Sequence, residues 1–129
     1  MAGRYLLDTN ILIALFKGEQ SVQDELEKAP EVFVPSIALG ELFYGAIHSA
    51  DPNRHLTQVE KLANTSTILN CDAVTAKHYG AIKHELKLLG QPIHENDLWI
   101  SAIAMQFSLV VVSRDRHFRV VPNLTIAEW

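Results

Sequence analysis

Short runs of apolar residues alternate with longer stretches of mixed polarity along the chain. Short apolar runs bounded by polar or turn-forming residues are typical of strands that are buried on both faces of a sheet. The strongest run is at residues 109–112, which is too short for a helix and rich in valine. Strands are predicted at residues 5–7, 32–34, 67–69, 109–112 and 124–126.

The segments between these runs carry helix signals. Ser21, Ser36 and Asp72 suit the N-cap position, Pro52 can open a helix, and Gly90 is a typical helix end. Helices are predicted at residues 11–16, 21–29, 36–49, 52–64, 72–90 and 96–107. Strands that alternate with helices predict an α/β fold, in which a mostly parallel central sheet lies between two helical layers and the crossovers are right-handed.

Composition narrows the class of protein. The 129 residues are 48% hydrophobic and 20% charged, which indicates one folded domain, residues 1–129, and excludes a disordered chain. The net charge of −4 excludes a generally basic nucleic-acid-binding surface, so such contact needs a local patch or a metal ion. The lone Cys71, the absence of a signal-peptide pattern and the lack of a long apolar run predict a cytoplasmic protein with no membrane span.

Four acidic residues fall where a parallel sheet would bring them together. Asp8 ends the first predicted strand, and Asp115 follows the strand at 109–112. Glu41 lies one to two turns into the helix after the second strand, and Asp97 starts the helix before the fourth. Because ligands of open parallel sheets bind beyond the carboxyl ends of the strands, we expect these four carboxylates to converge there.

Converging carboxylates need a counter-charge. Two carboxylates 5 Å apart repel by about 3 kcal/mol at an effective dielectric constant near 20. Grouped acids therefore have raised pKa values unless a cation neutralises them. Carboxylate oxygens without a histidine–cysteine set favour Mg²⁺, with Mn²⁺ as the alternative, over zinc. Such an ion can hold a phosphate and activate water, so the pattern predicts hydrolysis of a phosphodiester.

Each acid also has a structural interpretation. Asp8 could cap the helix that follows it, Asp97 suits the first turn of a helix, and Asp115 could be a turn residue. Glu41 points away from the apolar stripe expected at residues 39, 42, 43, 46 and 47. Its own face carries Ile37, Tyr44, Gly45 and His48, which suits the wall of a cleft.

Four segments resemble the PIN-domain ribonucleases, and most closely the VapC toxins of bacterial toxin–antitoxin pairs. They are LLDTNILI, PSIALGELFYGA, PIHENDLWISAIA and VVVSRDRHFRVVPNLTIAEW, and they occur in the family's order over essentially the whole chain. The resemblance implies a three-layer PIN-like sandwich. It also implies a metal-dependent endoribonuclease that cuts tRNA or other structured RNA.

The resemblance also implies roles for individual residues. By motif match, the metal-binding and catalytic acids are Asp8, Glu41, Asp97 and Asp115. We expect the three aspartates nearest the metal, with Glu41 positioning water or a second ion. Thr9, Asn10 and Ser113 match supporting polar positions, with Ser113 standing where the family often has threonine. His94 stands where VapC relatives often have glycine, and the resemblance therefore does not fix the local loop shape or substrate access.

Partners follow from the same resemblance. It implies a VapB-type antitoxin whose C-terminal segment blocks the acidic pocket, a homodimer, and contact with DNA only through the antitoxin. Apolar residues such as Leu15, Phe16, Phe43 and Tyr44 could form a groove for a partner helix or a self-contact. For the RNA substrate, Arg114 and Arg116 flank Asp115 and could hold phosphates beside the cut, although a solvated basic run is an equal alternative.

Other functions share parts of this pattern. A phosphoacceptor receiver domain would need a second acid after the first strand and a lysine after the late strand, and neither is present. A PIN fold used only for binding is disfavoured because all four acids are present. A PIN nuclease outside toxin–antitoxin systems, acting in RNA processing or on DNA, would use the same metal chemistry and stays open.

Overall fold

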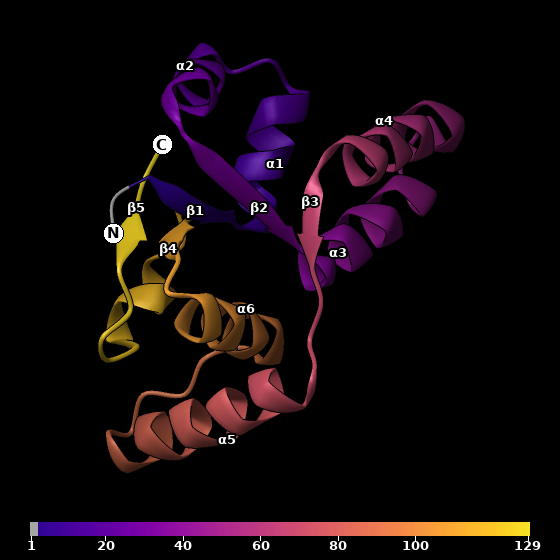
Figure 1. The fold of residues 1–129 in the computed structure, drawn as a ribbon. Helices are drawn as coiled ribbons and strands as arrows, with labels where there is room; N and C mark the ends of the chain where they lie inside the picture. The colour runs from indigo at the N-terminus through magenta and orange to yellow at the C-terminus, as the bar shows by residue number, and fades with distance from the viewer. Residues whose placement is uncertain (1–2) are drawn as a thin grey trace.

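The computed structural model describes residues 3–129, whose centre is a parallel sheet with helices on both faces (Figure 1). The sheet has five strands in the order β3-β2-β1-β4-β5, and every neighbouring pair is parallel. The strands are β1 (Arg4–Leu7), β2 (Glu31–Pro35), β3 (Thr67–Leu69), β4 (Val110–Val112) and β5 (Ile126–Ala127). The predicted α/β sandwich is confirmed.

Six α-helices and one short 3₁₀ helix connect these strands within residues 3–129. The helices are α1 (Thr9–Phe16), α2 (Gln20–Lys28), α3 (Ser36–Ile47), α4 (Pro52–Thr65), α5 (Ala73–Leu88) and α6 (Glu95–Phe107). The 3₁₀ helix at Arg116–Val120 follows β4. None of the helices among these residues combines the length and apolar character that crossing a membrane requires.

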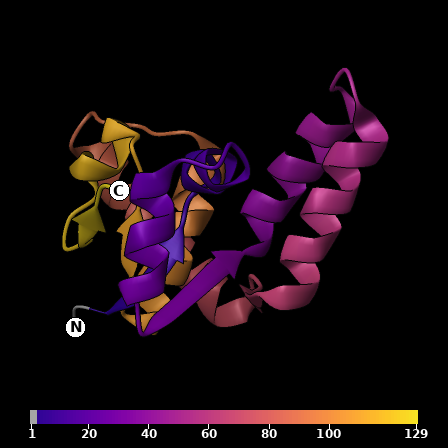
Figure 2. The ribbon, with the colours of Figure 1, turned by 90° about the horizontal axis from the view of Figure 1, so that it is seen from above.

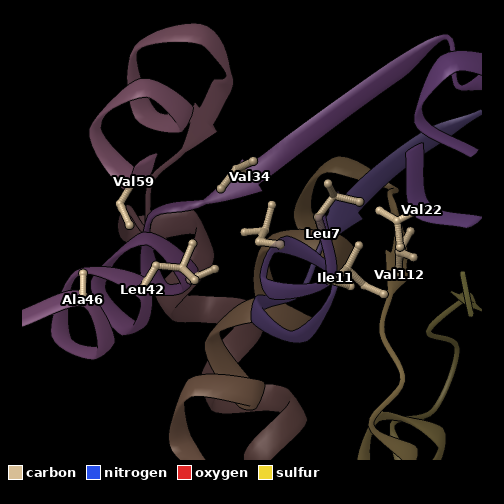
Figure 3. Packing of buried hydrophobic residues seen from close by; sticks show 11 residues of the cluster. Leu7, Ile11, Val22, Val34, Leu42, Ala46, Val59 and Val112 are labelled. Atoms are coloured by element: carbon tan, nitrogen blue, oxygen red, sulfur yellow. The ribbon is translucent and has the colours of Figure 1, made fainter. Parts of the chain in front are cut away.

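Alternate residues of each strand enter two different cores, as the pleat of a strand requires. Leu7 and Val112 pack with buried residues of α1 to α4 on one face (Figure 3). Their neighbours Leu6 and Val111 pack on the other face against α6 and Phe118. Helix α5 lies outside α6 and shares a third apolar cluster with it. The central strands are therefore buried on both sides, which explains why their sequences are continuous apolar runs.

Helices α3 and α4 form a pair that extends away from the rest of the molecule (Figure 2). The outer part of α3 consequently has little to pack against. Ile47, which the sequence pattern places on the apolar stripe, is 58% exposed, and Tyr44 is 67% exposed. Leu42 and Ala46 of the predicted stripe are buried, together with Ala38.

Several predicted boundaries are wrong by a few residues. Glu19 rather than Ser21 occupies the N-cap of α2. Ser36 is the first residue of α3 and not its cap, because the helix starts directly from the extended Pro35. The last strand begins at Ile126, since Leu124 packs against the α5 and α6 side of the sheet. The 3₁₀ helix was not predicted. The strand at Thr67–Leu69 and the Asp72 cap of α5 are confirmed.

Candidate active site

The carboxyl ends of β1, β2 and β4 lead to three of the four predicted acids. Asp8 follows β1 directly, and its N–H extends the sheet by donating to the carbonyl of Val112 at 3.0 Å. Asp115 lies three residues beyond β4, and Glu41 lies in α3, which begins where β2 ends. Asp97 is in the first turn of α6. We call Asp8, Glu41, Asp97 and Asp115 the acidic cluster.

Asp8 is the most firmly held member of the cluster and is only 5% exposed. One carboxylate oxygen accepts from the Thr9 N–H at 2.8 Å, which caps α1. The other accepts from the Ser113 hydroxyl at 2.7 Å and the Asn10 amide at 3.2 Å. Asp8 is thus both the helix cap and a candidate site residue, and Asn10 and Ser113 donate hydrogen bonds to its carboxylate.

Glu41 is linked to the same region through Thr9. The Thr9 hydroxyl donates to Glu41 Oε1 at 2.8 Å, which joins α3 to the first residue of α1. The carboxylate therefore faces the start of α1 although the residue is exposed. This contact supports interpreting the face of Glu41 as the wall of a cleft.

Asp115 is held by its own loop. Its N–H donates to the Ser113 hydroxyl at 3.0 Å. Its Oδ1 accepts from the His117 N–H at 2.9 Å and lies 2.7 Å from His117 Nδ1. Asp115 therefore also caps the 3₁₀ helix, as the turn interpretation suggested. Ser113 contacts both Asp8 and Asp115 and couples their positions.

The charges of the cluster act on one another. The pKa of Asp97 is raised from 3.8 to about 6, first by burial and then by the other three carboxylates, while His94 lowers it. Burial also raises the pKa of Asp8, and the charges of Glu41 and Asp115 add to this, against the lowering effect of its hydrogen bonds. Carboxylates from four distant parts of the chain thus act on the pKa values of Asp97 and Asp8.

The oxygen donors of the acidic cluster are of the kind that a divalent ion binds, but the carboxylates are not grouped closely enough to hold one. Among residues 3–129, no three or more histidine, cysteine or acidic side chains are arranged to hold a metal ion. Carboxylate oxygens are nonetheless the ligands that Mg²⁺ and Mn²⁺ take, and a cation would relieve the repulsion that raises the pKa of Asp97. The residues present therefore fit such an ion, with binding requiring the side chains to approach one another.

The two arginines beside Asp115 differ in their surroundings. Arg114 donates to both carboxylate oxygens of Glu19, at 2.9 Å and 3.3 Å, and to the main-chain oxygen of Trp129 at 3.0 Å. Arg116 is exposed at the start of the 3₁₀ helix. Sequence reasoning missed the Glu19 partner, because no local pattern relates residues so far apart.

An apolar groove of about 390 Å³ adjoins the acidic cluster between α1, α3 and α4. Glu41 lines both this groove and a second hollow beside Tyr44 and Asn96. The apolar wall consists of Ile13, Phe16, Leu42, Ala46 and Val59. Of the four groove residues expected from the sequence, Phe16 lines this groove, whereas Leu15, Phe43 and Tyr44 do not.

A parallel sheet with acids gathered at its carboxyl edge is the arrangement of the PIN domain. The model of the family described as PIN domain matches residues 5–124, so the chain belongs to this family. Ribonuclease VapC2 of Haemophilus influenzae is 36% identical, and the match covers 98% of both chains. The tRNA(fMet)-specific endonuclease VapC of Shigella flexneri is 33% identical with the same coverage. Within the PIN-domain family, the chain belongs to the VapC ribonucleases.

Solved structures agree with this assignment. The DNA-bound VapBC structure from Salmonella typhimurium matches with a TM-score of 0.91 at 31% identity, covering 98% of both chains. The VapBC2 structure from Rickettsia felis, bound to a promoter DNA fragment, matches with a TM-score of 0.89 at 29% identity, covering 97% of this chain and 98% of the other. The expected family and fold are confirmed. PIN-domain ribonucleases generally depend on divalent metal ions.

Proposed function

We propose that the protein is the toxin of a VapBC-type pair, an endoribonuclease that hydrolyses RNA phosphodiesters with a divalent ion in its acidic cluster. The observation that carries this proposal is the geometry at the carboxyl edge of the sheet, where one Ser113 hydroxyl contacts both Asp8 and Asp115 and the Thr9 hydroxyl holds Glu41. The raised pKa of Asp97, about 6, supports it. Mg²⁺ is the proposed ion, with Mn²⁺ as the alternative. One relative is named for cleavage of tRNA(fMet), and structured RNA, tRNA above all, is the proposed substrate class.

The residues of the cluster divide into fixed and adjustable members. Asp8 is fixed by three donors and would define one ligand position. Asp97 and Asp115 would complete the set, and Glu41, held by Thr9, would position the attacking water or a second ion. When bound, the ion lowers the pKa of water and stabilises charge on the phosphate oxygens. Arg116, exposed beside Asp115, is the proposed contact for a flanking phosphate.

The apolar groove between α1, α3 and α4 is the proposed docking site of an antitoxin segment. The structural relatives from Salmonella and Rickettsia are VapBC complexes bound to DNA. Glu41 lines the groove here, so an apolar peptide lying in it would reach the acidic cluster. Homodimer formation and indirect contact with DNA through the antitoxin belong to the same proposal.

The direct test is cleavage of tRNA and of a DNA of matched sequence, each with Mg²⁺, Mn²⁺ or EDTA. We expect cleavage of tRNA only, and only with a divalent ion. Because metal assistance contributes several kcal/mol to the transition state, Asp8→Asn and Asp97→Asn should each lose roughly a hundredfold or more in rate. Asp72→Asn, the same change at the cap of α5, should retain activity.

The outcomes separate the competing functions. Cleavage of DNA instead of RNA would favour a PIN nuclease of another kind. Absence of cleavage with both ions, by a folded protein, would favour a binding module. Wild-type activity in Asp8→Asn would remove that residue from the site. The Mg²⁺ and Mn²⁺ rates together decide between the two ions.

A further inference from the structure

The side chain of Arg114 joins three separate segments of the chain. Its guanidinium forms a two-pronged contact with Glu19, which lies between α1 and α2, and a third hydrogen bond with the main-chain oxygen of Trp129. Its main-chain N–H donates to Asn10 Oδ1 at 3.2 Å. The backbone and the side chain of this residue are therefore both anchored by hydrogen bonds.

The two neighbours of Arg114 belong to the acidic cluster and its support. Ser113 donates to Asp8 at 2.7 Å, and Asp115 donates its N–H to the Ser113 hydroxyl at 3.0 Å. A displacement of Arg114 would carry both neighbours with it. The Glu19 contact is therefore linked through Arg114 and Ser113 to both Asp115 and Asp8.

The contact between Glu19 and Arg114 orients the guanidinium more than it stabilises the fold. The side chains of Arg114 and Glu19 are 35% and 42% exposed, and exposed ion pairs contribute little to folding. The two-pronged geometry, however, fixes the direction of the guanidinium. Glu19 stands at the N-cap of α2, yet its side chain makes no capping hydrogen bond. Its carboxylate accepts hydrogen bonds from Arg114 instead.

We propose that Arg114 is a positioning residue for the acidic cluster, holding Ser113 and Asp115 in place through Glu19, and does not contact RNA phosphate. This rests on the proposed metal-dependent ribonuclease. It revises the role expected for Arg114 from the basic sequence around Asp115, and it assigns Glu19, on a different part of the chain, to the support of the site.

Arg114→Lys and Glu19→Gln test this together, with Arg4→Lys as the matched control. The lysine keeps the positive charge but cannot form the two-pronged contact. Arg4 also contacts one carboxylate, Glu31, and one main-chain carbonyl, that of Phe107, but it does so at the start of β1, the end of the strand opposite Asp8. The control therefore loses an arginine contact with one carboxylate, a single one at 3.5 Å, and with one carbonyl, at a site that does not touch the cluster.

Three measurements distinguish positioning from phosphate binding. Loss of an outer-shell contact typically costs 10–100-fold in metal affinity or activity, so Mn²⁺ titration should show about a tenfold weaker Kd in both test variants and less than about a twofold change in Arg4→Lys. The kcat for tRNA should fall by a similar factor while KM stays the same. The salt dependence of tRNA binding without metal should also be unchanged. A raised KM with a shallower salt dependence in Arg114→Ala, together with a normal Mn²⁺ Kd in Glu19→Gln, would overturn the proposal.

Hydrogen exchange tests the proposal independently of the ribonuclease assignment. The amides of Arg114, Asp115 and His117 are all hydrogen-bonded in the loop after β4. They should exchange faster in Arg114→Lys and Glu19→Gln than in wild type and Arg4→Lys. If wild type neither binds Mn²⁺ nor cuts RNA, the proposed function fails, and the exchange rates alone decide whether Arg114 holds the loop. Equal exchange in all four proteins would refute the positioning role.

Discussion

Replacing Asp97 by asparagine should stabilise the metal-free protein near neutral pH. The pKa of Asp97 is about 6 in the folded chain and 3.8 without the fold's influence. At 1.36 kcal/mol for each pKa unit, the charged carboxylate costs at most about 3 kcal/mol of folding free energy. Solvent reaches this partly buried side chain, which reduces the expected gain to about 1–2 kcal/mol. Asparagine removes the charge while keeping nearly the same shape.

The pH dependence has a definite sign. A carboxyl whose pKa is raised by folding binds its proton more tightly in the folded state than in the unfolded state. Its destabilising effect is therefore absent below about pH 4 and complete above about pH 6–7. The unfolding free energy of wild type should fall as pH rises through this window. The unfolding free energy of Asp97→Asn should fall less steeply with pH. A residual slope should come from Asp8, whose pKa is also raised.

Urea unfolding followed by circular dichroism measures this directly. In EDTA at pH 7.5, Asp97→Asn should be the more stable protein, and Asp24→Asn on the exposed face of α2 should resemble wild type. A ligand at 100 times its Kd stabilises a protein by about 2.7 kcal/mol. Saturating Mn²⁺ should therefore raise the unfolding free energy of wild type above that of Asp97→Asn. Lower stability of Asp97→Asn in EDTA, or an equal pH slope of the unfolding free energy in the two proteins between pH 4 and 6, would refute the reasoning.

Three further predictions concern residues around the cluster and in the core. Thr9→Val removes the hydroxyl that holds Glu41 and should lower kcat for tRNA about tenfold, whereas Thr9→Ser should retain most activity. Ser101→Ala should leave the urea unfolding free energy unchanged or raise it by about 1 kcal/mol, because the buried Ser101 hydroxyl has no hydrogen-bond partner within residues 3–129. Phe118→Ala should lower that free energy by about 3–5 kcal/mol, since the ring is fully buried beneath the loop carrying Asp115, and a loss below about 1 kcal/mol would contradict its core role.

The parts of the fold that the sequence predicts are those set by short-range patterns. The run at 109–112 could be interpreted as a buried strand because both of its faces are covered, which leaves no polar alternation. Asp72 could be recognised as a cap because its Thr75 partner lies within one turn. Strand direction then followed from the helical connections, and this placed the acids at one edge.

The parts that could not be predicted depend on contacts between distant residues. Glu19 is 95 positions from Arg114, and nothing in either local sequence indicates their contact. The exposure of Ile47 depends on how far α3 extends beyond the sheet. The helical periodicity of the α3 sequence does not indicate that length. The 3₁₀ helix depends on Phe118 entering the core below Asp115.

The acidic cluster combines a carboxylate that is held in place, Asp8, with one whose charge is not neutralised, Asp97. This combination suits an ion-dependent enzyme better than a structural role. Asp8 is satisfied by three hydrogen bonds, as a purely structural helix cap would be. Asp97 has a raised pKa, so its charge is a cost to the fold rather than a contribution. A purely structural acid in this position could be replaced by asparagine, which carries no charge, and His94 offsets the charge of Asp97 only in part. The chain instead keeps the carboxylate together with three others. The same negative charges that repel one another in the metal-free fold would attract a divalent cation.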